Sequence, residues 1–78
     1  MDKLAEKIDS ICSSYVFEKT DGEGYFDVSK FPKSGRKMFE CYENRTSRWA
    51  FASLTMQDDK ILGFMNKDFE DYVMKALG

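Results

Sequence analysis

Apolar residues recur at helical spacing near both ends of the chain. At the N-terminal end they lie three and four positions apart, so they share one side of a helix whose other side is charged. These apolar positions are Leu4, Ile8, Ile11, Cys12 and Tyr15. Asp2 can cap this helix, and three serines weaken the helix propensity toward its end. We therefore predict an N-terminal helix that ends near Ser14.

A second amphipathic pattern lies at the C-terminal end. Its apolar residues follow the i, i+3, i+4, i+7, i+8 spacing of one helix face. They are Phe69, Tyr72, Val73, Ala76 and Leu77. Asn66 is a good N-cap residue, and Asp68 and Glu70 complement the helix dipole in the first turn. The sequence therefore predicts a C-terminal helix that begins after Asn66.

The residues between the two helices favour strands. Residues 15–19 and 25–28 are rich in β-favouring side chains and are separated by a turn with two glycines, which predicts a hairpin. Residues 31–35 break regular structure, because Pro32 cannot donate a ladder hydrogen bond. Residues 36–64 then read as three consecutive strands. We predict about five antiparallel strands in chain order.

The alternation of side chains in residues 36–56 raises a question of register. In the third predicted strand, Phe39 and Cys41 share one face, and Met38 and Tyr42 share the other. In the fourth, the two faces are Ala50, Ala52, Leu54 and Met56 on one side and Trp49, Phe51, Ser53 and Thr55 on the other. If the small apolar side chains pack on the helices, the aromatic ones face away from the core. The reverse register buries the aromatic rings.

These elements define a domain of the α+β class. The chain has 78 residues, 42% of them hydrophobic, and a chain of this size supports only one core. We expect residues 1–78 to form a single domain with an N-terminal helix, a curved antiparallel sheet of four or five strands, and a C-terminal helix packed on the sheet. Two helices can cover one sheet face. The other face is then solvated, curled on itself or covered by a partner.

The charge is unevenly distributed along the chain. The formal net charge is −2, which argues against a protein that coats nucleic acid through bulk electrostatics. Residues 30–49, however, contain six basic and two acidic side chains, whereas the rest of the chain contains six and twelve. This polarity fits either a solvated face or a binding surface.

The sequence lacks the residues that most catalytic and metal-binding sites need. The chain has no histidine, which excludes a histidine-based triad and imidazole acid–base catalysis. Residues 19–30 resemble the middle of a calcium-binding EF-hand loop, but Lys19 and Lys30 stand where the motif needs acidic ligands. Cys12 and Cys41 lack the spacing of a metal pair and are expected to be small buried hydrophobes. We expect no enzyme activity, no metal and no cofactor.

Basic and aromatic residues coincide in residues 36–51. Arginine pairs with phosphate or carboxylate, and aromatic rings on a sheet face anchor protein partners or stack on bases. The predicted contact surface consists of Arg45, Arg48, Trp49 and Phe51, flanked by Arg36, Lys37 and Tyr42. The alternative is that Trp49 and Phe51 lie in the core and the arginines only keep the loop soluble.

These features favour a small non-catalytic protein–protein interaction module that modulates or inhibits a larger protein or nucleoprotein partner. The alternative is a single-stranded nucleic-acid or RNA binding module that uses the same surface. We find no signal peptide and no apolar run of membrane-spanning length, so we expect a cytoplasmic protein in a reducing compartment, without a membrane partner. A compact chain of this kind would suit an accessory protein of a phage or mobile element. The sequence does not indicate the oligomeric state.

Overall fold

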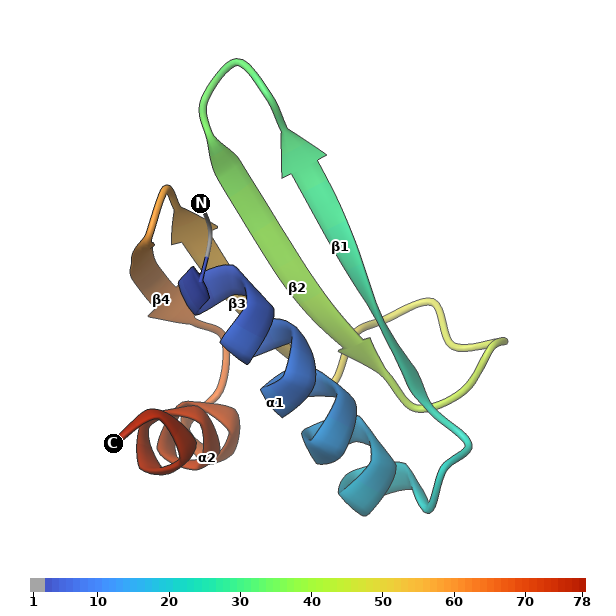
Figure 1. The fold of residues 1–78 in the computed structure, drawn as a ribbon. Helices are drawn as coiled ribbons and strands as arrows, with labels where there is room; N and C mark the ends of the chain where they lie inside the picture. Colours follow the sequence, from blue (N-terminus) through green and yellow to red (C-terminus); the bar gives the residue numbers. More distant parts are fainter. Residues whose placement is uncertain (1–2) are drawn as a thin grey trace.

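A computed structural model describes residues 3–78 as two helices and four strands (Figure 1). In chain order they are α1 (Lys3–Thr20), β1 (Tyr25–Phe31), β2 (Arg36–Tyr42), β3 (Ala52–Gln57), β4 (Lys60–Phe64) and α2 (Lys67–Leu77). The predicted α+β architecture is confirmed, with four strands in the sheet. Asp2, which was expected to cap the first helix, lies outside the described residues.

The four strands form one antiparallel sheet in the order β1-β2-β3-β4, and the sheet does not close into a barrel. Neighbouring strands are consecutive in the chain, so each pair is joined by a turn or loop rather than by a crossover. A register shift between Thr55 and Met56 places a bulge in the pairing of β3 with β4. Both helices lie on the same side of the sheet (Figure 1), where α1 contacts β1 and β2 and α2 contacts β4. We call the side that faces the helices the inner face.

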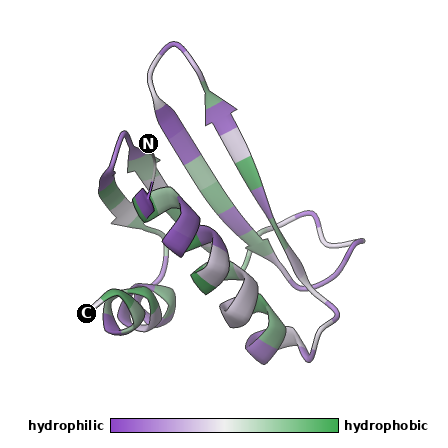
Figure 2. Ribbon diagram, viewed as in Figure 1, coloured by the Kyte–Doolittle hydropathy of each residue, from purple (hydrophilic) through white to green (hydrophobic). Residues whose placement is uncertain are grey.

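The core lies between the helices and the inner face. Figure 2 shows bands of hydrophilic and hydrophobic residues along β1 and β2, as expected for strands with one buried face. The buried side chains are Ala5, Ile8, Cys12, Tyr15, Val16, Phe39, Cys41, Ala52, Leu54, Met56, Phe69 and Val73. Phe39 faces Leu54 across β2 and β3, and Cys41 faces Ala52. The small apolar face of the fourth predicted strand therefore packs on the helices.

The two cysteines are free and fully buried, one on α1 and one on β2. A hydrogen bond with the Cys41 thiol and burial raise the pKa of the Cys12 thiol far above its usual value. Cys12 therefore stays protonated at neutral pH and behaves as a small core side chain, as the sequence predicted.

The predicted strand at residues 15–19 is wrong, because this segment is the last part of α1. Tyr15 and Val16 extend the buried stripe of the helix and are 2% and 3% exposed, so their packing overrides their β propensity. The helix ends at Thr20, since Asp21 and Gly22 have positive φ angles of 57° and 85°. The turn at residues 20–24 is therefore a helix-to-strand connection. The first hairpin of the fold is formed by β1 and β2.

Two boundaries also differ from the prediction. The strand β3 begins at Ala52, so residues 43–51 form a loop, and Trp49 and Ala50 lie in that loop. Asn66 occupies the N-cap position of α2 with extended φ and ψ of −137° and 151°, but its side chain makes no capping hydrogen bond. The position of this N-cap was predicted correctly. The hydrogen bond that its side chain was expected to accept from the first turn of α2 is missing.

Candidate interaction surface

One face of the sheet is not covered by either helix within residues 3–78. Phe39 and Cys41 point to the helices, so the alternating residues of β2 point the other way. We call this side the outer face. Along β1 and β2 it carries four cross-strand pairs, which are Tyr25 with Tyr42, Asp27 with Glu40, Ser29 with Met38, and Phe31 with Arg36.

An aromatic and cationic cluster lies at one end of the outer face. The rings of Tyr25 and Tyr42 stack with their centroids 5.0 Å apart and an interplanar angle of 11°. The guanidinium carbon of Arg45 lies 5.1 Å from the centre of the Tyr25 ring, which is the geometry of a cation–π contact. Tyr25 was not among the predicted site residues. Its role depends on pairing with a residue seventeen positions away, which no local pattern reveals.

Acidic side chains lie next to this cluster on the outer face. Asp27 and Glu40 are directly opposite each other on β1 and β2. Burial, followed by the charge of Glu40, raises the pKa of the Tyr42 hydroxyl above its usual value. The hydroxyl of Ser29 lies 3.4 Å from a carboxylate oxygen of Glu40 and donates to it. The middle of the outer face is therefore negatively charged, and it separates the two ends.

The loop at residues 43–51 is held by the side chain of Asn44. Its Oδ1 accepts hydrogen bonds from the backbone N–H of Thr46 at 2.9 Å, from the Thr46 hydroxyl at 2.7 Å and from the Ser47 hydroxyl at 3.2 Å. This is the geometry by which asparagine stabilises a turn. The loop presents Arg48 and Trp49 to solvent, and Trp49 is 85% exposed. Trp49 is exposed because it lies in this loop, before β3 begins, and not because strand alternation directs it outward.

Phe51, by contrast, does not join this surface. Its ring stacks on the buried Tyr15 of α1 at 5.9 Å with an interplanar angle of 24°. Its backbone N–H donates to the carbonyl of Cys41 at 2.8 Å. Phe51 precedes β3, so strict strand alternation does not decide its direction, and it packs on the aromatic side of the core.

The remaining predicted residues lie at the opposite end of β2. Arg36 and Lys37 begin the strand that Tyr42 ends, so about 20 Å separates them from the tyrosine pair at the rise per residue of a strand. The predicted surface is therefore divided. We call the loop surface its larger part, Tyr42, Arg45, Arg48 and Trp49, together with Tyr25, which the structure adds.

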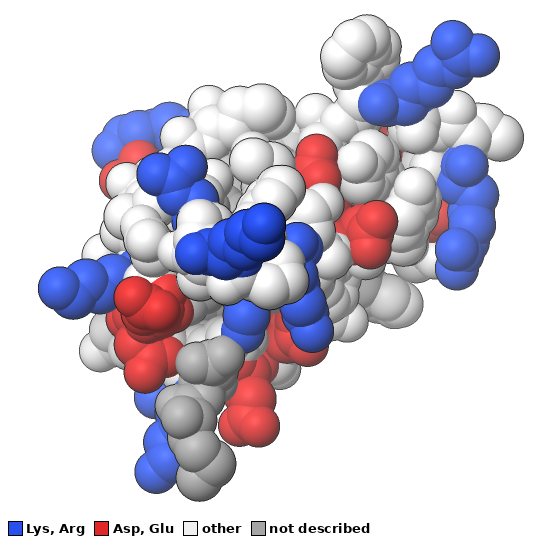
Figure 3. Space-filling model, turned by 90° about the horizontal axis from the view of Figure 1, so that it is seen from above, with Lys and Arg blue, Asp and Glu red and all other residues white. Residues whose placement is uncertain are grey.

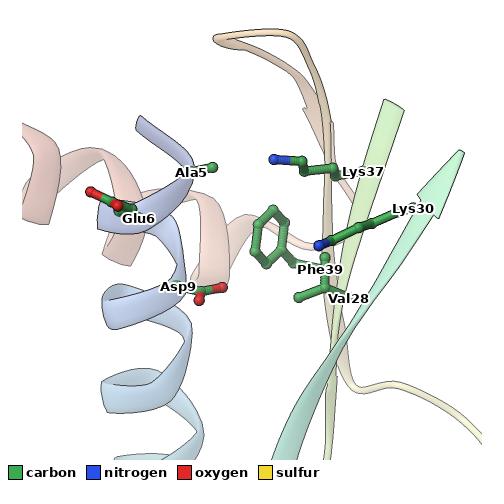
Figure 4. A pocket seen from close by; sticks show the side chains of 7 residues that line it. All are labelled: Ala5, Glu6, Asp9, Val28, Lys30, Lys37 and Phe39. Carbon is green, nitrogen blue, oxygen red and sulfur yellow. The ribbon is translucent and has the colours of Figure 1, made fainter. Parts of the chain in front are cut away.

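A cleft that the sequence did not predict lies between α1 and the hairpin of β1 and β2 (Figure 4). It has a volume of about 300 Å³, with Val28 and Phe39 on its strand side. Lys30 and Lys37 extend from the strands toward the helix, which contributes acidic side chains (Figure 4). The acidic residues that line the cleft are Glu6 and Asp9. Only the docking of α1 on the sheet brings these two charged rows together.

Within residues 3–78, no group of three or more acidic or cysteine side chains is arranged to hold a metal ion. No helix in the described part of the chain is long and apolar enough to cross a membrane. Comparison of the chain with known protein families, with curated proteins and with solved structures finds no significant match.

Proposed function

We propose that this protein is a non-catalytic interaction module that binds a larger protein through the loop surface and thereby modulates or inhibits it. The supporting observation is Trp49, which is 85% exposed on a loop that the Asn44 side chain holds in place. A large exposed aromatic side chain is unfavourable in water, and tryptophan, tyrosine and arginine are the residue types enriched in binding hot spots. A loop that is already ordered loses little further entropy on binding.

The residues around Trp49 indicate the chemistry of the partner. An indole that docks in an apolar pocket excludes water, and the neighbouring arginines then pair with carboxylates in a partly desolvated environment. Arg45 is held over the Tyr25 ring, so its guanidinium is positioned in advance and keeps its N–H donors available. A partner with an apolar pocket rimmed by acidic side chains fits this arrangement.

Substitution of Trp49 tests this proposal. In a pull-down from lysate of the source organism, Trp49→Ala should weaken capture of the partner by about thirtyfold, the effect of losing a hot-spot residue. Its free energy of unfolding should stay within about 0.5 kcal/mol of the original, because the side chain has almost no contacts to lose.

Phe17→Ala is the matched control, because Phe17 is another aromatic residue, 67% exposed, but it lies on α1. This variant should retain the partner. The proposal is wrong if Trp49→Ala keeps full binding, if both variants lose the partner equally, or if Trp49→Ala unfolds the domain.

A single-stranded nucleic acid is the second candidate ligand of the loop surface. The stacked Tyr25 and Tyr42 rings with Arg45 beside them resemble a platform for a base and its phosphate. Against it, Asp27 and Glu40 lie next to the platform and would repel the phosphate chain. Titration with short single-stranded DNA and RNA at low and high salt distinguishes the two functions, and absence of binding at low salt excludes the second.

A further inference from the structure

The turn between β1 and β2 forms one end of the molecule, and a second basic region lies there. From Val28 to Phe39 the chain contains four basic residues and no acidic one. Figure 3 looks onto this end of the molecule, and lysine and arginine side chains gather in the middle of the view, with acidic side chains beside them. The loop surface does not include these residues. We call Lys30, Lys33 and Arg36 the basic turn.

The three side chains of the basic turn are exposed and available. Within residues 3–78 they make no ion pair, hydrogen bond or cation–π contact. Unpaired cations at one end of a short hairpin repel one another, and an anionic ligand relieves that repulsion. Lys37 has an interaction of its own and is not needed in this surface.

The backbone that carries the basic turn is fixed by hydrogen bonds. The backbone N–H groups of Ser34 and Gly35 both donate to the carbonyl of Phe31 at 3.0 Å. The neighbouring turn between β3 and β4 supports it, because the Asp58 N–H donates to the Gly35 carbonyl at 3.2 Å and the Gln57 side chain donates to the Ser34 carbonyl at 2.8 Å. The cations are therefore presented by a rigid platform.

The cations lie on both faces of the hairpin. Lys30 alternates with Phe31 along β1, so it belongs to the inner face, whereas Arg36 is the outer-face partner of Phe31. Lys33 lies in the turn between them. A single phosphate chain needs cations on one side only, whereas a groove of duplex DNA has a row of phosphates on each wall.

We infer that the basic turn is a docking site for the phosphate backbone of duplex DNA, which the hairpin enters with its turn first. Phe31 is 48% exposed at this end and is followed by Pro32. These two apolar side chains would lie between the two rows of phosphates when the turn enters the groove. Phe31 and Pro32, together with Lys30 and Arg36 of the basic turn, border a shallow hollow of about 300 Å³. The site lies on a different surface from that of the proposed protein partner and does not depend on it.

Nearby carboxylates limit how the duplex can approach. Asp58 lines the same hollow, and its side chain lies close to Gly35. On the helix side, Asp9 points toward the strand that carries Lys30, whereas the carboxylate of Glu6, which also lines the cleft, points away from the strands (Figure 4). These groups repel phosphate on both sides of the turn. They favour an approach along the hairpin axis and keep the contact to a few phosphates.

Fluorescence anisotropy with a labelled duplex of about 20 base pairs tests the site across a range of salt concentrations. For three phosphate contacts, the logarithm of the association constant should fall with the logarithm of salt concentration with a slope of about −2.7. The variant Lys30→Gln, Lys33→Gln, Arg36→Gln should bind at least about tenfold more weakly at low salt and lose nearly all of this slope.

The matched control is Lys7→Gln, Lys67→Gln, Lys75→Gln, which removes the same charge from exposed helix positions. It should bind the duplex like the original protein, and so should Trp49→Ala. The inference is overturned if the protein does not bind the duplex at low salt or if the control loses as much affinity as the basic-turn variant. It is also overturned if a single strand or poly-glutamate of equal length binds more tightly than the duplex.

Asp58→Asn provides a test by gain of affinity. Asp58 has a positive φ of 55°, a conformation that asparagine also adopts readily, so the turn should remain intact. Removal of the carboxylate should strengthen duplex binding about two- to fivefold at low salt. Unchanged or weaker binding would contradict the placement of the phosphates at this turn.

Discussion

Tyr15 contacts aromatic residues of α2 and of the loop before β3, which its local sequence pattern does not predict. Its ring lies 4.8 Å from the Phe69 ring and 5.0 Å from the Tyr72 ring of α2, and it also stacks on Phe51. The Lys19 ammonium lies 5.6 Å from its centre. Aromatic pairs of this kind add stability beyond the area that they bury. Tyr15 thus joins α1, α2 and the loop that carries Trp49.

At the same scale, Tyr72 provides a pH-dependent contribution to stability. Its hydroxyl donates a hydrogen bond to the Glu18 carboxylate, and this bond, together with burial, raises the pKa of Tyr72 to about 12. Because the folded protein holds the proton more tightly than the unfolded chain, this stabilisation is complete below about pH 10. It is lost as the pH rises to about 12. Tyr72→Phe should therefore remove a phenolate absorbance step near pH 12 from the ultraviolet titration.

Glu18→Ala should lower the pKa of Tyr72 toward its usual value, because the acceptor and its charge are both removed. Glu6→Ala removes an exposed carboxylate elsewhere on α1 and should leave this step unchanged. If Tyr72→Phe leaves the high-pH part of the titration as it was, the hydrogen bond to Glu18 is absent in solution.

At the scale of elements, the connection from α1 to β1 depends on Thr20 and Gly24. The Thr20 hydroxyl donates to the Val16 carbonyl at 2.6 Å and accepts from the Gly24 N–H at 2.7 Å. A Cβ at position 24 would overlap the backbone oxygen of Tyr42 and lie 2.7 Å from Cγ2 of Thr20. The glycine is required for this close approach of the backbone to β2.

We expect Gly24→Ala to lower the free energy of unfolding by about 1–3 kcal/mol, the usual cost of forcing atoms into a packed site. Gly63→Ala is the control, because no atom lies within 4 Å of the added Cβ there. Its unfolding free energy should change by less than about 0.5 kcal/mol. Urea denaturation of both variants measures the difference, and equal stability of the two would contradict the close packing at Gly24.

At the scale of the whole molecule, the order of the strands predicts which strands are protected from amide hydrogen exchange. The strands β2 and β3 each have a neighbour on both sides, and their buried side chains, Phe39, Cys41, Ala52, Leu54 and Met56, are at most 1% exposed. The strands β1 and β4 each have one open edge within residues 3–78. Part of the backbone amides on those edges therefore faces solvent.

Amide hydrogen exchange followed by NMR should find the slowest amides in β2 and β3, because they open only with global unfolding. Faster exchange is expected for β1, especially toward the turn with β2. If β1 were as protected as β2, its edge would be covered in solution, for example by a second copy of the chain.

The local pattern was sufficient for much of the fold. The spacing of Phe69 and Val73 identified α2, and the alternation along β2 placed Phe39 and Cys41 on one face without showing which face is buried. Leu54 and its small neighbours were correctly grouped on one face of the next strand, but the sequence left open whether that face or the aromatic one packs in the core. These features depend on residues within a few positions of one another, for which the helix and strand periods are reliable guides.

The tertiary structure decided the rest. Tyr15 is helical because it packs on residues of α2, which its own neighbours in sequence do not specify. Arg36 and Trp49 belong to one basic-aromatic stretch in sequence, but the length of β2 and the loop after it place them at opposite ends of the sheet. By itself, the sequence determined the two terminal helices and the antiparallel strands between them, because these follow from local periodicity, but not where the first helix ends or which strand face is buried. Only long-range pairing and packing decided which charged and aromatic residues share a surface.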